Sequence, residues 1–299
     1  MPMIPASELI INPDGSIYHL HLRPEQLADN IILVGDPGRV PVVADFFDSK
    51  EFVITNREFI IITGSYNGKR MTVMSTGMGT DNIDIVLTEL DALANVNFKT
   101  REINPVHRTL NMVRIGTSGS MQDHITIGSY VLSEISVGFD NTLNYYAGRE
   151  GISLHDFEDA FMAHMQWTPR LAFPYFVKSS KKLNTLFKEF CVEGMTISSP
   201  GFFGPQGRIV RLPLADPDMN AKVTAFKHKD KVITNYEMES SALAGLGRLL
   251  GHEATTVCYI IANRIQQTTD SNYKTGHQAN NSMNDLIQKV LDKLASLES

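Results

Sequence analysis

The sequence predicts an α/β fold, a single three-layer domain around a mixed central β-sheet that spans residues 1–299. Apolar runs of strand length alternate with segments of helical periodicity along most of the chain, as in three-layer α/β proteins. A length of 299 residues suits one large domain or two small ones. We see no repeat, low-complexity tract or proline-rich linker that would divide the chain. One domain is therefore the better interpretation.

The N-terminal half of the chain contains mainly predicted strands. Residues 31–34 (IILV) form a continuous apolar run that ends at Gly35, as a buried strand would. Residues 51–79 indicate several strands, with a hairpin turn at the Asn-Gly pair of residues 67–68. A helix follows, because apolar residues recur at helical spacing at Ile83, Val86, Leu87 and Leu90. Residues 95–108 are polar and are predicted to be a long loop before a strand within residues 112–119 (MVRIGTSG), which ends in a turn of small residues.

The C-terminal half alternates more regularly, except in residues 139–180, where helix and loop are mixed. The predicted elements are a β-rich stretch at 125–138, a helix at 181–190, a strand at 194–199, a helix within 235–250, an apolar strand at 253–262 and a final amphipathic helix at 283–294. The polar segment 263–281 is predicted to be a loop that covers a site.

Composition excludes several classes of function. A formal net charge of −6 argues against a nucleic-acid-binding protein. No run of about 18 apolar residues predicts a membrane span, and the first residues lack the pattern of a secretory signal, so we expect a cytoplasmic protein. Its two cysteines, Cys191 and Cys258, form no CxxC pair, and the nine histidines show no ligand spacing. Neither a disulfide framework nor a metal site is expected.

Arginines stand at the ends of predicted strands, where they can bind an anion. Gly35 to Arg39 (GDPGR) follow a buried strand, and backbone N–H groups in such a turn can surround an anion together with the guanidinium. A plain turn with Arg39 in water is the alternative. Arg114 lies inside an apolar strand, which requires a negative partner, either a ligand or a structural acid. Arg57 raises the same two possibilities.

A glycine-rich loop, residues 201–208 (GFFGPQGR), has the groups needed to bind a heterocyclic base. Gln206 offers a donor and an acceptor, Arg208 offers donors, and Phe202 can stack on a planar ring. The alternative is a surface loop with a hydrophobic anchor. The glycines at 77–79 and 64–68 match neither a dinucleotide fingerprint nor a Walker loop.

Two carboxylates, Glu237 and Glu239, precede the apolar run of the helix predicted within residues 235–250. A carboxylate can accept two hydroxyl hydrogens, so a vicinal diol such as that of ribose is a natural partner. Side chains two apart on a helix do not share a face, which predicts unequal roles for the two acids.

Taken together, GDPGR, NREF, STGMG, VRIGTSGS, GPQGR, NYEMES and IIANR resemble the nucleoside phosphorylase-I family over most of the chain. The QGR element is similar to that of the pyrimidine-acting branch. Purine-acting relatives carry a Ser-Asp pair where this chain has Asn263. The resemblance implies a pentosyltransferase that cleaves uridine with phosphate, releasing uracil and ribose 1-phosphate, with phosphate as co-substrate and no cofactor. The alternatives are a purine phosphorylase, a nucleosidase of the same fold or a non-catalytic nucleoside-binding homologue.

The resemblance also implies the roles of individual residues. Phosphate would be bound by Gly35, Arg39, Arg114 and Thr117, with Arg57 from the neighbouring subunit. Ribose would be bound by Glu237, Met238 and Glu239, with His19 from the partner. The base would be bound by Ser118, Gly119, Phe202, Gln206 and Arg208. The catalytic residues would be Arg114, Gln206, Arg208 and Glu239.

A homo-oligomer is implied as well, either a dimer or a hexamer, with sites shared across a dimer interface. Segments 95–108 and 139–180 are longer than in the short bacterial enzymes, which leaves the choice between the two assemblies open. Some relatives hold a potassium ion with a Glu and a Ser. Glu58 is present here, but Asn82 replaces the serine, so no ion is predicted.

Overall fold

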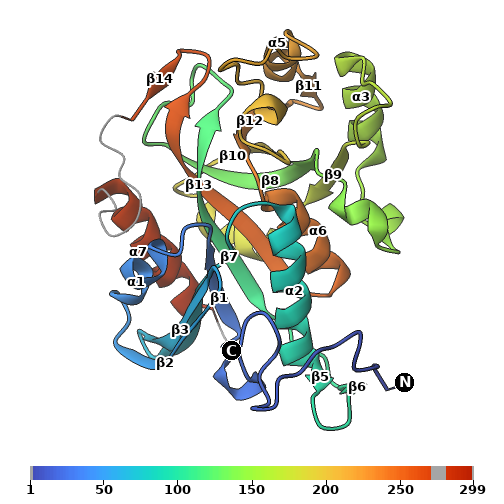
Figure 1. The fold of residues 1–299 in the computed structure, drawn as a ribbon. Coiled ribbons are helices and arrows are strands. Elements are labelled where there is room, and N and C mark those ends of the chain that lie inside the picture. Colours follow the sequence, from blue (N-terminus) through green and yellow to red (C-terminus); the bar gives the residue numbers. More distant parts are fainter. Residues whose placement is uncertain (1–2, 271–280, 298–299) are drawn as a thin grey trace.

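A mixed twelve-stranded sheet runs through the protein, whose computed structural model describes residues 3–270 and 281–297 (Figure 1). The main path of the sheet is β11-β12-β10-β8-β13-β7-β1-β4-β3-β2, with β9 paired to β8 and β14 to β13. The strands are β1 (Asn30–Val34), β2 (Ser49–Asn56), β3 (Phe59–Tyr66), β4 (Lys69–Ser75), β7 (Asn111–Ser120), β8 (Tyr130–Gly138), β9 (Tyr175–Lys178), β10 (Val192–Ser198), β11 (Lys227–His228), β12 (Lys231–Glu237), β13 (Glu253–Asn263) and β14 (Thr268–Thr269). A separate small sheet pairs β5 (Val96–Asn97) with β6 (Glu102–Ile103).

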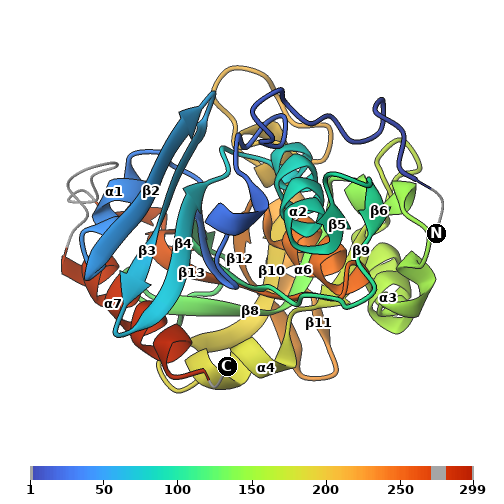
Figure 2. The ribbon, with the colours of Figure 1, turned by 90° about the horizontal axis from the view of Figure 1, so that it is seen from below.

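Helices cover both faces of the sheet. The α-helices are α1 (Arg39–Ala44), α2 (Thr80–Asn95), α3 (His155–Met165), α4 (Lys181–Phe187), α5 (Met219–Ala225), α6 (Ser240–Leu249) and α7 (Asn281–Ala295). Short 3₁₀ helices occupy η1 (Pro24–Gln26), η2 (Thr142–Tyr145), η3 (Arg149–Gly151) and η4 (Gly204–Gln206). Figure 1 shows α2 and α6 on one side of the central strands and α1 and α7 on the other. Figure 2 shows α4 near α7, and the hairpin strands β2 to β4 far from α3.

The central strand β1 explains the three layers. Successive side chains of a strand point to opposite faces. Ile31 and Leu33 belong to the apolar cluster that contains α2 and α6, whereas Ile32 and Val34 belong to the cluster that contains α1, α4 and α7. A strand covered on both faces therefore needs an unbroken apolar run, which is what residues 31–34 provide.

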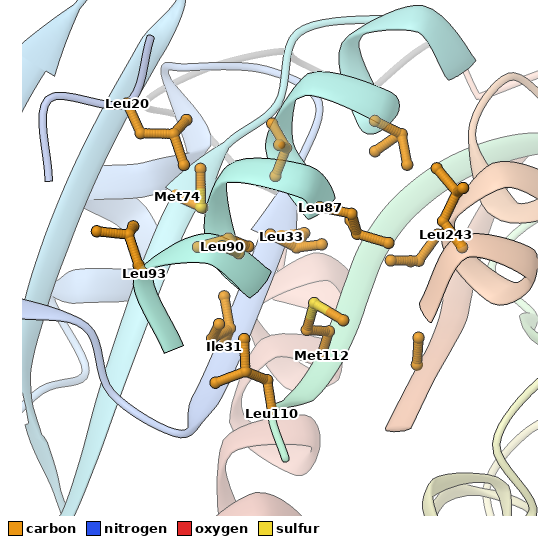
Figure 3. Packing of buried hydrophobic residues seen from close by; sticks show 14 of the residues in the cluster. Leu20, Ile31, Leu33, Met74, Leu87, Leu90, Leu93, Leu110, Met112 and Leu243 are labelled. Carbon is orange, nitrogen blue, oxygen red and sulfur yellow. The ribbon is translucent and has the colours of Figure 1, made fainter. Parts of the chain in front are cut away.

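Helix α2 anchors the first layer (Figure 3). Leu87 and Leu90 are fully buried, and Leu93 is 2% exposed; all three lie in one cluster with Leu33 and Met112. Complete burial of such a side chain contributes about 1.5–3 kcal/mol to the free energy of unfolding. This packing fixes the N-terminal end of α2, and with it Gly79, beside the carboxyl ends of the strands.

The sheet closes on itself through a second pairing of strand β12. Strand β12 pairs in parallel with β10 and also pairs antiparallel with the end of β7, so that β7, β13, β8, β10 and β12 form a closed ring. The closing pairs are Asn235 with Ser120 and Tyr236 with Gly119. Closure therefore places the ends of β7 and β12, which are far apart in the sequence, next to each other.

Most elements agree with the sequence predictions. The Asn-Gly hairpin is confirmed, with positive φ angles of 48° at Asn67 and 74° at Gly68. Two predictions need correction. Strand β7 continues through Ser120 instead of ending in a turn of small residues, because β13 and β12 both pair with its end. Residues 235–237 belong to β12, and the helix begins only at Ser240.

The segments that were hardest to predict contain short elements. Residues 139–180 include η2, η3, α3 and β9, and the polar excursion 95–108 contains the small β5–β6 sheet. Part of the predicted covering loop, residues 271–280, lies outside the described residues. Within the described ranges, no helix is both long and apolar enough to cross a membrane.

Candidate active site

A buried ion-pair cluster lies where β7 meets the β12–α6 junction. Arg114 projects from β7 and is 5% exposed. Its Nη1 lies 3.3 Å from Oε2 of Glu237, and its Nη2 donates to Oε2 of Glu239. Burial alone would lower the pKa of Arg114, but the charges of Glu239 and Glu237 outweigh it and raise that pKa. The negative partner that the sequence demanded for Arg114 is thus a pair of acids.

The two acids meet at one arginine because neither lies within the helix. Glu237 ends β12, and Glu239 is the residue before the first turn of α6. The expectation that they point apart assumed that both were helical, and the structure contradicts that assumption. The two acids are still unlike each other in the structure, because the other hydrogen-bond partners of their carboxylates differ.

The carboxylate of Glu237 accepts hydrogen bonds from the first residues of α6. Its carboxylate accepts the backbone N–H of Glu239 at 2.8 Å and that of Ser240 at 2.9 and 3.0 Å. It also accepts the hydroxyls of Ser240 at 2.7 Å and Ser198 at 2.6 Å. The first N–H groups of a helix lack partners within the helix, and a carboxylate there satisfies them and interacts favourably with the helix dipole. Glu237 therefore holds the β12–α6 corner in place.

Glu239 has fewer partners within the protein. Besides Arg114 it accepts the backbone N–H of Gly79, at the N-terminus of α2, at 2.7 Å. It is 2% exposed. Burial raises the pKa of Glu239 and the charge of Glu237 adds to this effect, whereas Arg114 opposes it. Its neighbour Met238 is half-buried between the two acids. Of the two carboxylates, Glu239 therefore keeps more accepting capacity.

The predicted phosphate residues other than Arg57 lie on or just after the adjacent parallel strands β1 and β7. Gly35 follows β1, and a Cβ at Gly35 would lie 3.5 Å from Nη2 of Arg114. Arg39 begins α1, is 6% exposed and donates from Nη1 to the carbonyl of Ile115 on β7 at 3.1 Å. Thr117 lies further along β7 and is half-buried. Arg39 is thus drawn to the same strand as Arg114, and the alternative of a solvated Arg39 is excluded.

Three of the predicted base-binding residues, Phe202, Gln206 and Arg208, form one packed unit, whereas Ser118 and Gly119 lie on β7. The guanidinium carbon of Arg208 lies 3.7 Å from the ring centroid of Phe202, and Nη1 donates to Oε1 of Gln206 and to the Phe202 carbonyl, each at 2.5 Å. Gln206 is 2% exposed, whereas Phe202 is 51% exposed. Burial, and then the charge of Arg264, lower the pKa of Arg208 to about 10. The loop therefore holds its polar groups in a fixed arrangement with one aromatic face.

Arg264 was missed by the sequence analysis. It follows the last residue of β13, and its Cδ would lie 3.2 Å from a Cβ at Gly119. Its guanidinium carbon lies 5.8 Å from the ring centroid of Tyr236, and Nη1 is buried without a hydrogen-bond partner among the described residues. The signal was an arginine that follows an apolar strand, as Arg39 does.

Comparison with known proteins decides the family. A family model described as "Phosphorylase superfamily" matches residues 29–295. The chain belongs to the phosphorylase superfamily. Relatives include the uridine phosphorylase of Thermococcus kodakarensis, 27% identical over 84% of this chain and 79% of that protein. The guanosine phosphorylase of Halorubrum lacusprofundi is 24% identical over 93% and 98%.

A solved structure also resembles this chain closely. It is reported as "Trypanosoma brucei nucleoside phosphorylase shows uridine phosphorylase activity" and superposes with a TM-score of 0.86 at 28% identity, covering 97% of this chain and 100% of that one. The three-layer fold with a mixed sheet predicted from the sequence is thus confirmed as the fold of this phosphorylase superfamily member.

Two predicted site residues of this phosphorylase lie together outside the Arg114 cluster. Nδ1 of His19 forms a hydrogen bond with Glu89 at 2.6 Å, and Nδ2 of Asn56 donates to the backbone carbonyl of His19 at 2.7 Å. Arg57 is exposed on the turn between β2 and β3, and its guanidinium carbon lies 5.5 Å from the ring centroid of Tyr18. Among the described contacts, Arg57 reaches Tyr18 and not Arg114 or Glu239.

One cluster has the residue types of a metal site. The ligand atoms of Asp91, His107 and His252 lie within 4.8 Å of one another. The backbone N–H of Leu110 donates to Nδ1 of His252 at 3.2 Å, so Nε2 carries the proton and donates it to Asp91 at 3.1 Å. His107 in turn contacts the carbonyl of Leu250 through Nε2 at 3.0 Å. Since His252 has no free lone pair, the geometry favours a hydrogen-bonded link between α2 and β13 over a metal centre.

Proposed function

We propose that this protein is a uridine phosphorylase, a pentosyltransferase that converts uridine and phosphate to uracil and ribose 1-phosphate. One observation carries the proposal. Arg114 bonds to Glu239, and Gly35 lies against the same guanidinium. An anion-binding arginine and a diol-binding carboxylate are therefore in contact, as phosphate and ribose must be in this reaction. The T. kodakarensis and T. brucei relatives support the choice of nucleoside.

The reaction moves charge from sugar to base. Phosphate attacks C1′ while the bond to N1 of uracil breaks, so the sugar becomes cationic and the base becomes anionic. Arg39 and Arg114, with Gly35 and Thr117, orient phosphate and turn an encounter into a positioned reaction. Glu239 accepts the 2′- and 3′-hydroxyls, and its charge favours the cationic sugar. Inorganic phosphate is the co-substrate, and these steps need no cofactor.

The base loop stabilises the leaving group. Arg208 and Gln206 donate to the uracil edge, and hydrogen bonds to a developing anion strengthen in the transition state. In the structure these two side chains bond each other at 2.5 Å, so uridine binding exchanges one charged hydrogen bond for another. Phe202 packs on the nucleoside, with Ser118 and Gly119 near the base. Arg264, which lies over Gly119, adds a second cation on the same side.

A purine substrate is the second candidate, because the H. lacusprofundi relative is a guanosine phosphorylase. Asn263 argues against it. Its Nδ2 donates to the carbonyls of Gln122 and Ile125 at 3.1 and 3.0 Å, and its Oδ1 accepts two backbone N–H groups of the following turn. Asn263 is fully buried by these contacts and has no proton to give to a purine ring. Comparing uridine with inosine and guanosine under the same conditions separates the candidates.

The deciding experiment follows uracil release from uridine with and without phosphate. We expect release only with phosphate, since a nucleosidase of the same fold would proceed without it and a non-catalytic homologue would not turn over at all. Arg208→Ala should lower kcat/KM about 10²–10³-fold, as for loss of one preorganised donor. Arg248→Ala, at an exposed position near the end of α6, is the matched control and should leave kcat/KM unchanged. Wild-type kinetics in Arg208→Ala would rule out its base-binding role.

A further inference from the structure

A large apolar cavity lies beside the base loop rather than at the Arg114 cluster. Its volume is about 1150 Å³. It is bounded by the segment after α3, by the connection between β10 and α5, and by the carboxyl ends of β8 and β10. Cavities of roughly 300–1,000 Å³ with apolar walls and few polar groups are the usual form of small-molecule sites. Residues 139–180, whose role the sequence did not explain, form part of its wall, and residues 200–219 form the rest.

Aromatic and aliphatic side chains form most of the cavity wall. Phe139 and Trp167 pack against each other with ring centroids 5.0 Å apart and ring planes tilted by 56°, and Trp167 donates from Nε1 to the Ala172 carbonyl at 3.0 Å. Phe203 and Leu212, on the β10–α5 connection, are 57% and 75% exposed. The wall therefore offers two aromatic rings packed at an angle on one side and an exposed apolar loop on the other.

The charged groups of the wall are mainly arginines. Arg170, Arg208 and Arg211 line the cavity, whereas Asp216 is its one acid among the described lining residues. Asp216 is already paired with Lys222 at 2.8 Å. Arg170 and Arg211 form no ion pair with any residue that the structure describes. Apolar walls with unpaired cations match a ligand that has an apolar body and a negative group.

Arg208 belongs both to this wall and to the base-binding unit. An anion bound to its guanidinium from the cavity would withdraw a donor that the proposed reaction needs for uracil. We propose that the cavity is a binding site for an amphipathic organic anion, such as an aromatic or aliphatic acid, and that its occupancy inhibits the enzyme by competing with uridine through Arg208. The predicted competition with uridine rests on the proposed function, but the predicted binding of the anion in the cavity does not.

The single tryptophan of the chain makes binding directly measurable, because Trp167 itself lines the cavity. The probe is 8-anilinonaphthalene-1-sulfonate, which has an apolar body and one negative group. Added to the native full-length protein, it should bind saturably, quench Trp167 emission and show energy transfer from Trp167. Arg170→Ala and Arg211→Ala should each weaken binding about three- to tenfold, the effect of losing one partly solvated charged hydrogen bond. Arg248→Ala should have no effect.

Kinetics then test the link to the base loop. At fixed phosphate the probe should raise the KM for uridine and leave kcat unchanged, and Arg170→Ala should reduce this inhibition while keeping normal kinetics without probe. Absence of saturable binding, binding without energy transfer, or equal affinity in Arg170→Ala, Arg211→Ala and Arg248→Ala would each overturn the site. Binding that appears only as the protein is diluted would show instead that a second copy covers the cavity. If uridine is not a substrate at all, the kinetic measurement is lost, but the fluorescence measurements still decide the site.

Discussion

Glu237 and Glu239 have the same chemistry but different partners, and their substitution by glutamine should separate stability from activity. Glu237 accepts the backbone N–H groups of residues 239 and 240. Glu237→Gln turns an amide donor against one of these N–H groups, and should lower the free energy of unfolding by about 1–3 kcal/mol. Glu239→Gln should fold normally and reduce kcat/KM about ten- to hundredfold, because a charged hydrogen bond to the diol contributes ~1.5–3 kcal/mol. Chemical denaturation and uridine kinetics on both variants give the comparison. Equal effects of the two substitutions on both properties would contradict the division.

The pH dependence of activity follows from Glu239. Burial, reinforced by Glu237, raises its pKa, so it takes up a proton at a pH at which an ordinary glutamate is still charged. Neutral Glu239 pairs weakly with Arg114 and accepts fewer hydroxyls, so kcat/KM should fall on the acid side well above pH ~4.3. Because this carboxyl has a raised pKa in the folded state, its contribution to stability is largest at low pH and is lost as pH rises through that pKa.

As the pH is lowered, kcat/KM should therefore decrease at a higher pH than the melting temperature does. The measurement pairs a pH profile of kcat/KM with melting temperatures at the same pH values. Glu239→Gln removes the titrating group, so its residual activity should lose the acid limb. An acid limb that persists in this variant would assign it to another group.

At the scale of single elements, strand β7 has a glycine, Gly116, at the position where a side chain would clash with Arg114. A Cβ at Gly116 would lie 2.2 Å from Nη1 of Arg114 and 3.1 Å from Sγ of Cys258. Arg114 can occupy its position beside the two acids only because residue 116 has no side chain. The position thus couples the backbone of the strand to the geometry of the ion-pair cluster.

Gly116→Ala should consequently displace the Arg114 guanidinium. We expect kcat/KM for uridine to fall at least tenfold with a rise in the KM for phosphate, since a misplaced positioning group costs rate even when the fold persists. Gly151→Ala is the control, because no atom lies within 4 Å of a Cβ there and its φ is not in the left-handed region. Normal phosphate kinetics in Gly116→Ala would show that Arg114 tolerates the shift.

The sequence predictions were most informative where a residue type is energetically costly in its local surroundings. Arg114 within an apolar strand required a negative partner, and two acids supply it. The run at residues 31–34 predicted a strand covered on both faces, because alternate positions are equally apolar. The ring closure between β12 and β7 could not be predicted, since it depends on pairing residues more than 100 positions apart. The cavity beside Trp167 depends on tertiary arrangement and was missed as well, whereas Arg264 was missed although it follows a predicted apolar strand.

At the scale of the whole molecule, exposed Arg57 and half-buried His19 lie outside the cluster to which phosphate and ribose are assigned. Arg57 lies on the turn that leads from edge strand β2, stacked on Tyr18, and has no acid partner among its described contacts. His19 is held in place by Glu89. A fixed, exposed cation next to a fixed histidine suits a contribution to another subunit's site. We therefore propose a homo-oligomer in which each site is completed across a two-fold dimer interface.

Mixing two impaired variants tests this assembly. In a hybrid of Arg57→Ala and Glu239→Gln chains, one site would combine the intact Glu239 of the first chain with the intact Arg57 of the second. The other site would carry both defects. Random exchange of subunits should thus restore about a quarter of wild-type activity, because half the dimers are hybrids with one working site each. The assay is uracil release after mixing under conditions that allow exchange. If Arg57 instead serves the site of its own chain, every site contains one defect, and mixing restores nothing beyond the average of the two variants.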